Sequence, residues 1–136
     1  MGNKWFAQRR YSNIKLLVGK ADNLSKFSDE SFDVVFTDAV LMYVGPDKIE
    51  KVMREMFRIT RKALIFIELH CKSQVKDPYG LGTFHLCYWK RNYIDLLSQF
   101  VEKNKISLYK IPKDLRPARN WQESGFLIEV TMDKRI

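Results

Sequence analysis

The stretch Ser31–Val44, which reads SFDVVFTDAVLMYV, decides the fold of this chain. A short apolar strand is predicted from Phe32 to Phe36, and it ends at the polar pair Thr37-Asp38. A new apolar segment, Val40–Val44, follows and is predicted to form a brief helical turn. In open α/β sheets, ligands bind where strands end. The sequence therefore places a candidate binding site at this junction.

A helix followed directly by a buried strand is predicted next. Asp47 can cap the helix, and Glu50, three residues later, completes a capping box. Apolar residues then recur at helical spacing up to about Arg61. The run ALIFI at Ala63–Ile67 is typical of a parallel strand buried on both faces. This order of elements is typical of α/β folds.

The remaining segments complete the predicted order. A second helix is expected from Trp89 to about Lys103, and Arg91, Asn92 and Tyr93 at its start can cap it or bind an anion. The other predicted segments are a helix at Asn3–Tyr11, a strand at Ile14–Val18, a long loop at Glu68–Tyr88, and strands at Lys105–Ile111 and Gly125–Thr131 joined by Pro112–Ser124 without helical spacing. Because parallel neighbours need a long crossover, the last two strands are expected to run antiparallel.

Composition limits the class of protein. With 136 residues, 46% of them hydrophobic, residues 1–136 are expected to form a single domain. No window approaches the roughly 18 apolar residues of a membrane span, and the first residues lack a secretory apolar core. The two cysteines are too few for a disulfide framework, so a cytoplasmic protein without membrane association is predicted. The net charge of +8 is spread along the chain, which indicates either a solvated basic surface or attraction of an acidic partner.

Several motifs resemble the second half of a class I S-adenosylmethionine-dependent methyltransferase. They are GKADNL at Gly19–Leu24, the opening stretch, VMREMFRITRKALIFIELH at Val52–His70 and, in the tail, His85, Trp89, Arg91, Asn92, Tyr93, Trp121 and Gly125–Val130. No segment resembles the Gly-rich first motif of that family. The resemblance implies an incomplete α/β methyltransferase fold. It would be a Rossmann-like, mostly parallel sheet flanked by helices and ending in an antiparallel strand pair, with the final strand beside Ala63–Ile67.

The resemblance also implies which residues would contact S-adenosylmethionine. They are Lys20 and Ala21 at the adenine edge, and Thr37, Asp38 and Ala39 in the wall after the strand of the opening stretch. Family members commonly have an acid where Lys20 stands, and an ammonium has no acceptor for the exocyclic amine of adenine. Asp22 can replace that acid only if the turn is re-aimed. Because the Gly-rich turn is also missing, the chain alone is expected to bind the cofactor weakly or not at all.

Three residues are candidates for chemistry on the methyl acceptor. Glu68 and His70 follow the buried strand, where a general base can lie, and a hydrogen-bonded structural role also fits them. Tyr43 occupies a position where relatives often have a residue near the substrate, and packing in the core also fits it. The two histidines and two cysteines match no common zinc spacing, so no metal site is predicted.

The sequence leaves three classes of function open. They are a portion of an S-adenosylmethionine-dependent methyltransferase acting on an unidentified acceptor, a non-catalytic relative serving as a structural or partner subunit, and a basic module that binds nucleic acid or another anion. In the family order, the strand at Ile14–Val18 lies beyond the two missing strands, so unpaired sheet edges are expected. Either it pairs directly with Phe32–Phe36 or another chain fills the gap. Because Gly19–Ser31 barely reaches the length of a parallel crossover, a homodimer formed by strand exchange or edge pairing is predicted.

Overall fold

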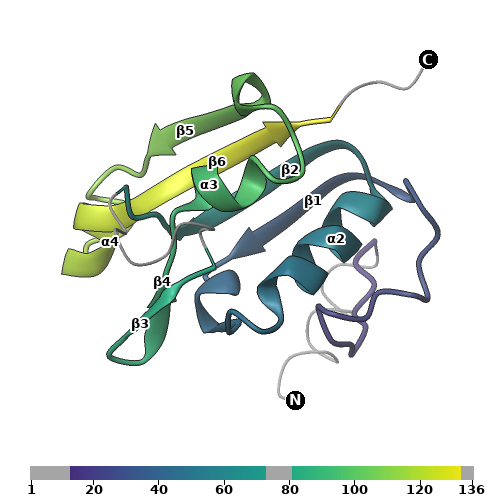
Figure 1. Cartoon of the computed structure of the whole chain (residues 1–136), viewed down its shortest axis with the longest axis horizontal. Coiled ribbons are helices and arrows are strands. Elements are labelled where there is room, and N and C mark those ends of the chain that lie inside the picture. The colour runs from purple at the N-terminus through teal and green to yellow at the C-terminus, as the bar shows by residue number, and fades with distance from the viewer. Residues whose placement is uncertain (1–12, 73–80, 133–136) are drawn as a thin grey trace.

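The structure is a computed structural model that describes residues 13–72 and 81–132. A four-stranded sheet in the order β1-β2-β6-β5 forms its centre, with helices α2 and α3 lying across one face and the hairpin β3-β4 beside them (Figure 1). The elements, in chain order, are β1 Phe32–Asp38, the 3-10 helix η1 Leu41–Tyr43, α2 Ile49–Ile59, β2 Thr60–Leu69, β3 Thr83–His85, β4 Tyr88–Lys90, α3 Tyr93–Leu97, the 3-10 helix η2 Lys103–Lys105, β5 Ile106–Lys110, α4 Arg119–Ser124 and β6 Gly125–Thr131.

The sheet is mixed, which confirms the predicted fold class. Among the described strands, β1 and β2 are parallel, whereas β6 is antiparallel to both β2 and β5. The final strand β6 thus lies between β2 and β5, as predicted for the end of the fold. The antiparallel pairing of β5 with β6 is also confirmed.

The core lies between the sheet and helix α2. The apolar stripe of α2 faces the sheet through Ile49, Val52, Met53, Met56 and Ile59, all buried. Opposite this stripe, alternate residues of β2 and β6 are buried, because successive strand residues point to opposite faces. One face of the sheet is therefore well packed.

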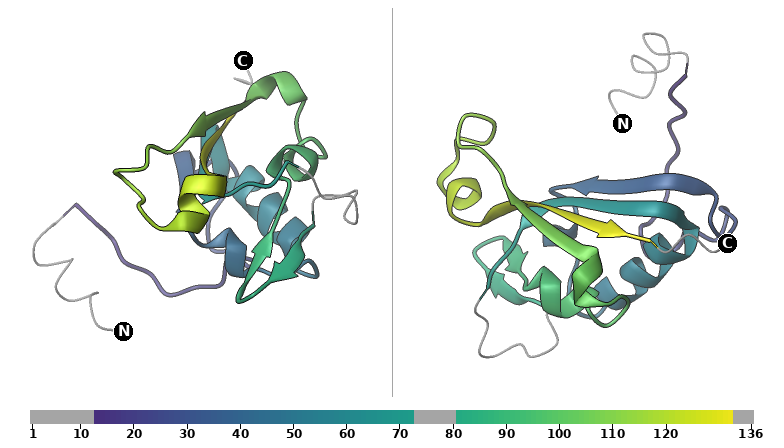
Figure 2. Two further views of the ribbon diagram at one scale, coloured as in Figure 1. Left: turned by 90° about the vertical axis from the view of Figure 1, so that its left-hand side faces the viewer. Right: turned by 90° about the horizontal axis from the view of Figure 1, so that it is seen from above.

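The expectation that Ala63–Ile67 is buried on both faces is wrong. Leu64 and Phe66 are fully buried against the helices, whereas Ile65 and Ile67 on the other face are only half-buried. Helices α2 and α3 lie on the same side of the sheet, so the opposite face lacks the cover that they provide (Figure 2).

The predicted capping box at the start of α2 is also wrong. Lys48 is the N-cap residue, and no side chain caps the helix. Instead, Gly45 O accepts hydrogen bonds from Lys48 N and Ile49 N, each at 3.1 Å. The carbonyl group of Gly45 therefore accepts the hydrogen bonds at the start of the helix, which the Asp47 side chain was expected to accept.

The predicted strand at Ile14–Val18 is wrong as well. Residues 13–19 pair with no strand, and Ile14, Leu17 and Val18 are exposed. In both views of Figure 2 this segment extends away from the sheet, beyond β1. A strand needs a neighbour for its backbone groups, and no described strand lies next to this one. The predicted helix at Asn3–Tyr11 lies outside the described residues.

The second half of the chain contains short elements that the patterns missed. The segment predicted as a long loop holds the hairpin β3-β4, and the predicted helix from Trp89 is much shorter, because Trp89 belongs to β4. Asn92 caps α3 by accepting hydrogen bonds from Ile94 N and Asp95 N at 3.1 and 3.3 Å, which confirms the capping role. None of the helices in the described parts of the chain has the length and apolar character needed to span a membrane.

Candidate functional site

The carboxyl ends of β1 and β2 lie side by side, because the two strands are parallel with Asp38 opposite Ile67. Ala39 leaves β1 in a left-handed backbone conformation with φ of 53°, and its N–H donates to Ile67 O at 2.9 Å. This turn takes the chain directly into η1. The segment Val40–Val44 is therefore held at the ends of both strands, where α/β proteins bind ligands.

Glu68 holds the backbone N–H groups of that segment. Its side chain is fully buried, and its Oε1 accepts hydrogen bonds from Val40 N at 3.0 Å and Leu41 N at 2.9 Å. Its Oε2 accepts from Met42 N at 3.3 Å, and Thr37 Oγ1 donates to Oε1 at 3.0 Å. Burial raises the pKa of Glu68, and these donors oppose the rise. The carboxyl group is thus committed to capping η1 and is not free to act as a general base.

Arg91 holds the carbonyl groups of the same segment. It is also fully buried, and its Nη1 donates to Leu41 O at 2.6 Å while its Nη2 donates to Val44 O. Its Nε donates to Leu81 O at 2.7 Å. The next residue, Gly82, has φ of 121°, and a Cβ there would lie 3.1 Å from Arg91 Nε. A buried anion and a buried cation therefore fix opposite backbone groups of one short segment, an arrangement that we call the η1 clamp.

His70 is fixed by its own hydrogen bond. Its ring is buried, its Nδ1 accepts from Tyr93 N at 3.2 Å, and it meets the Phe126 ring edge-on at 5.5 Å. Burial lowers the pKa of His70, nearby Lys72 lowers it further, and Asp95 opposes both. The imidazole is therefore neutral near pH 7 and serves as an acceptor for the first turn of α3.

A cavity of about 320 Å³ lies between the turn after Gly19 and the segment that the η1 clamp holds. Ala21 and Asp22 line one side, and Tyr43, with 65% of its surface exposed, lines the other. The turn is closed by Asn23 N, which donates to Lys20 O at 3.0 Å. Asp22 is thereby brought to the cavity wall.

A second cavity, of about 490 Å³, opens beyond the end of β2. Its walls come from Leu69, the β3-β4 hairpin with His85 and Tyr88, and helix α4 with Arg119 and Glu123. Sequence reasoning missed this cavity, because neither the hairpin nor α4 has a periodic pattern. The sequence gives one indication of this cavity, which is the cluster of polar and aromatic residues within the predicted loop Glu68–Tyr88.

Comparisons with known proteins show which fold this chain shares. Residues 3–67 match the methyltransferase domain family. The structure is similar to that of an S-adenosylmethionine-dependent methyltransferase from Thermotoga maritima, described as a possible histamine N-methyltransferase, with 17% identity, a TM-score of 0.55, and coverage of 96% of this chain and 70% of that chain. It is also similar to a protein from Pyrococcus horikoshii OT3, with 16% identity, a TM-score of 0.57, and coverage of 95% and 64%. No curated protein matches significantly. This chain has a partial class I methyltransferase fold.

The two kinds of comparison cover different parts of the methyltransferase fold. The sequence match ends at Ile67, in the middle of β2, so the later elements are identified by structural similarity alone. The chain spans 70% and 64% of the two solved chains, which agrees with the incomplete fold that the sequence predicted.

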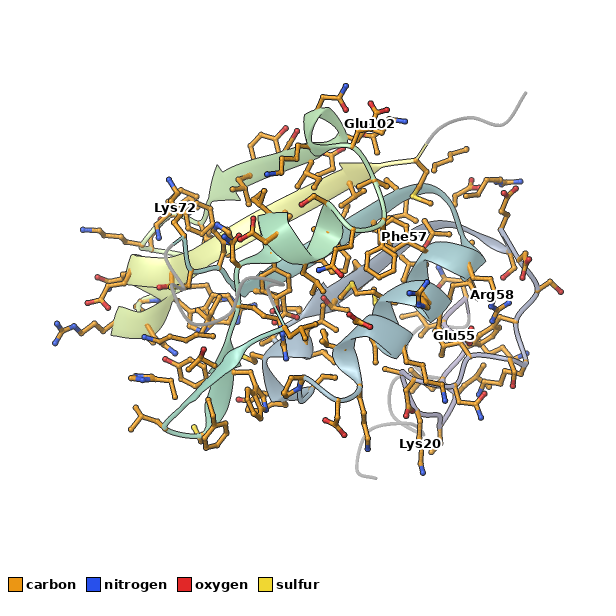
Figure 3. The ribbon with its side chains drawn as sticks, in the orientation of Figure 1. Lys20, Glu55, Phe57, Arg58, Lys72 and Glu102 are labelled. Carbon is orange, nitrogen blue, oxygen red and sulfur yellow. The ribbon has the colours of Figure 1, made fainter. Side chains whose placement is uncertain are left out.

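The predicted adenine-edge residues of the methyltransferase fold do not all face the same space. Ala21 and Asp22 line the cavity of about 320 Å³, whereas Lys20 does not. Lys20 is exposed, and its side chain points away from the body of the protein (Figure 3). Within this turn, Asp22 rather than Lys20 thus faces the cavity.

The predicted wall after β1 is largely occupied by structural contacts. Thr37 donates its hydroxyl hydrogen to the clamp carboxylate. Asp38 forms an ion pair with Arg116, whose guanidinium carbon lies 4.5 Å from the ring centroid of Trp121. Tyr43 is exposed, so the interpretation of Tyr43 as a core residue is wrong. Of the three residues considered for acceptor chemistry, Tyr43 alone faces a cavity.

Proposed function

We propose that this chain forms the C-terminal portion of the S-adenosylmethionine site of a methyltransferase, and that the cavity beside Tyr43 receives the adenine end of the cofactor. One observation carries the proposal. The turn containing Ala21 and Asp22, which the sequence resemblance places at the adenine edge, and the segment that the η1 clamp holds line one cavity, although Thr37, Asp38 and Ala39 do not line it. The η1 clamp keeps one side of this cavity in place without a ligand.

Asp22 is the residue that we assign to the exocyclic amine of adenine. A carboxylate oxygen accepts the hydrogen bond that the amine donates, and the ammonium of Lys20 offers no acceptor. Within the described residues, the Asp22 carboxylate has no hydrogen-bond partner, so it is available for a ligand. The turn closed between Lys20 and Asn23 directs the Asp22 side chain into the cavity, so Asp22 can take the place of the acid that relatives have at the position of Lys20.

The chemistry of methyl transfer needs few protein groups. The acceptor nucleophile attacks the methyl carbon as the sulfur–carbon bond breaks, so the site contributes mainly by positioning the reactants and excluding water. Glu68 and His70 are committed to backbone hydrogen bonds, so neither is free to serve as a base for the acceptor. Because no Gly-rich turn is present in the sequence, we expect binding by this chain alone to be weak.

Titration of ¹⁵N-labelled protein with S-adenosylhomocysteine tests the cofactor site. We expect saturable amide shifts at Ala21, Asp22 and Tyr43 with a Kd near 1 mM, which corresponds to about 4 kcal/mol of binding free energy. Asp22→Asn should weaken binding roughly fivefold, since a neutral amide oxygen accepts the hydrogen bond about 1 kcal/mol more weakly than a carboxylate does. Asp114→Asn, in an exposed loop, is the matched control and should leave Kd unchanged. Absence of shifts at several millimolar ligand, or equal loss in both variants, would contradict the proposal.

A non-catalytic role is the second candidate, and the η1 clamp favours it. Both strand-end residues that can act as bases are used to hold the backbone, so this chain offers no free base there. Transfer of a tritiated methyl group from S-adenosylmethionine to lysate acceptors separates the two functions. Labelling that Asp22→Asn reduces, in proportion to its weaker cofactor binding, supports the enzyme. Binding of S-adenosylhomocysteine without any labelling supports the non-catalytic subunit.

A further inference from the structure

The outer edge of β1 has unpaired backbone groups. Among the described residues, β1 pairs with β2 alone, and it lies at the end of the sheet order. Ala39 N donates to Ile67 O, and in a parallel pair every second residue bonds the same neighbour. The N–H and C=O groups of Phe32, Val34, Phe36 and Asp38 therefore point outward from the sheet edge.

The exposed face of the same strand is apolar. Phe32, Val34 and Phe36 are 38%, 48% and 69% exposed, on the face opposite to α2 and α3. In the strand register, Phe36 lies beside Ile65 on β2, so the apolar surface continues across the sheet. Monomeric proteins rarely leave such a surface uncovered.

This edge also lacks two of the residue types that protect natural edge strands from pairing. Such edges usually carry lysine or proline, and β1 contains neither. Its two charged residues are already neutralised, Asp33 by Arg61 and Lys62 and Asp38 by Arg116. Nothing on β1 therefore repels a second strand.

We infer that β1 pairs with β1 of a second copy of this chain, antiparallel and about a two-fold axis at Val35. This register pairs all seven residues of the strand and satisfies every outward N–H and C=O group. Val34 then lies opposite Phe36 of the other copy, which gives apolar cross-strand pairs. Asp33 faces Thr37 and Asp38 faces Phe32, so no like charges are opposed. Any other two-fold register leaves part of the strand unpaired.

The extended segment at residues 13–19 adds to this interface. A single strand pair is smaller than the roughly 1,200–2,000 Å² of a stable interface. Ile14, Leu17 and Val18 are exposed. The segment that contains them extends beyond β1, on the side of its free edge, where the second copy would be (Figure 2). The inference does not depend on cofactor binding. Because each copy carries a charge of +8, added salt should strengthen the dimer by screening repulsion.

Sedimentation equilibrium with matched variants tests the inference. The wild type should reach twice its mass of 16.2 kDa at tens of micromolar and associate more tightly at higher salt. Phe36→Lys should remain monomeric with an unchanged far-UV circular dichroism spectrum. Tyr109→Lys adds the same charge to the same face, on the opposite edge strand β5, and should remain dimeric. A monomeric wild type, a dimeric Phe36→Lys or a monomeric Tyr109→Lys would overturn the inference.

Disulfide trapping tests the register independently of any loss of folding. In a background with Cys71→Ser and Cys87→Ser, Val35→Cys should form a covalent dimer on oxidation, because self-opposed residues lie about 4.5 Å apart at Cα. Residue 34 of one copy is a diagonal neighbour of residue 34 of the other copy, at about 7–8 Å, so Val34→Cys should not cross-link. Cross-linking of Val34→Cys with none for Val35→Cys would refute the two-fold axis at Val35.

Discussion

Replacing Glu68 with leucine is the most direct test of the η1 clamp. Glu68→Leu keeps an apolar side chain of similar size and removes both acceptor oxygens. Leu41 N and Met42 N then lose their acceptor, at 2.9 and 3.3 Å, in residues that are almost completely buried. Val40 and Thr37 also lose a bond, but they are partly exposed and can turn to water.

The magnitude follows from these donors. A buried N–H left without a partner costs roughly 1–3 kcal/mol, so the two buried groups cost about 4 kcal/mol together. Burial of the leucine side chain and removal of a buried charge offset roughly 1 kcal/mol. We therefore expect a loss of about 3 kcal/mol in the free energy of unfolding, or roughly 6–12 °C in Tm. Glu68→Gln keeps one acceptor oxygen and relieves the buried charge, so it should cost only about 1–2 kcal/mol.

Urea denaturation followed by tryptophan fluorescence measures these losses, at one fixed protein concentration because dimerisation alters apparent stability. Glu129→Leu is the matched control, since Glu129 is half-buried on the neighbouring strand β6 and its side chain makes no hydrogen bond among the described residues. It should stay within about 0.5 kcal/mol of wild type. The capping role of Glu68 would be refuted if Glu68→Leu cost no more than this control.

Three further predictions concern the same region. Arg91→Lys should lower the free energy of unfolding in urea by roughly 2–4 kcal/mol, because one ammonium cannot reach three backbone carbonyls. The control Arg119→Lys, in an exposed ion pair, should change it by less than about 0.5 kcal/mol. Gly82→Ala should lower Tm through a loss of roughly 1–3 kcal/mol, because φ is 121° there and the new Cβ would press on the Arg91 guanidinium; an unchanged Tm would count against this. The folded pKa of His70 is lowered, so its contribution is complete above pH 6.5 and is lost as pH falls from 6.5 toward that lower value; His70→Gln should flatten the dependence of stability on pH in this range.

The strands of the central sheet could be predicted from the sequence because each is rich in apolar residues, whereas the three-residue strands β3 and β4 could not. Gly125–Thr131 was predicted with the bounds that the structure has, and the strand that begins at Phe32 was short by only two residues. The helices were predicted less well. Helix α4 has six residues, Arg119–Ser124, which is too short for helical spacing to be distinguished from a loop. The strand at Ile14–Val18 failed because its pattern says nothing about whether a neighbouring strand exists.

The sequence points to the residues of the candidate site, but not to the contacts that they make. The rule that ligands bind at strand ends directs attention to Glu68 and His70, which the structure shows bonded to backbone groups. Their hydrogen bonds reach partners 23 to 31 positions away in the chain, and those of Arg91 reach as far as 50. The spacing of neighbouring residues does not indicate which residues meet across 50 positions, so the sequence pattern places Arg91 only at the start of a helix. The buried positions of the acid and the arginine decide their roles, and burial follows from the packed fold.

The η1 clamp matters for the proposed cofactor site, because it holds the wall at Tyr43 in place although the Gly-rich part of the family's site is missing from this sequence. Its contacts to Val40–Val44 come from β2 and from the end of β4, both within this chain. The wall of the cavity at Tyr43 therefore needs neither a ligand nor a Gly-rich turn to take its shape. A preformed wall loses little conformational entropy on binding, so even an incomplete site should show measurable affinity. Glu68→Leu should accordingly weaken S-adenosylhomocysteine binding more than its loss of global stability explains, at a temperature where the variant is fully folded. Equal affinity in the folded variant would show that the clamp serves stability alone.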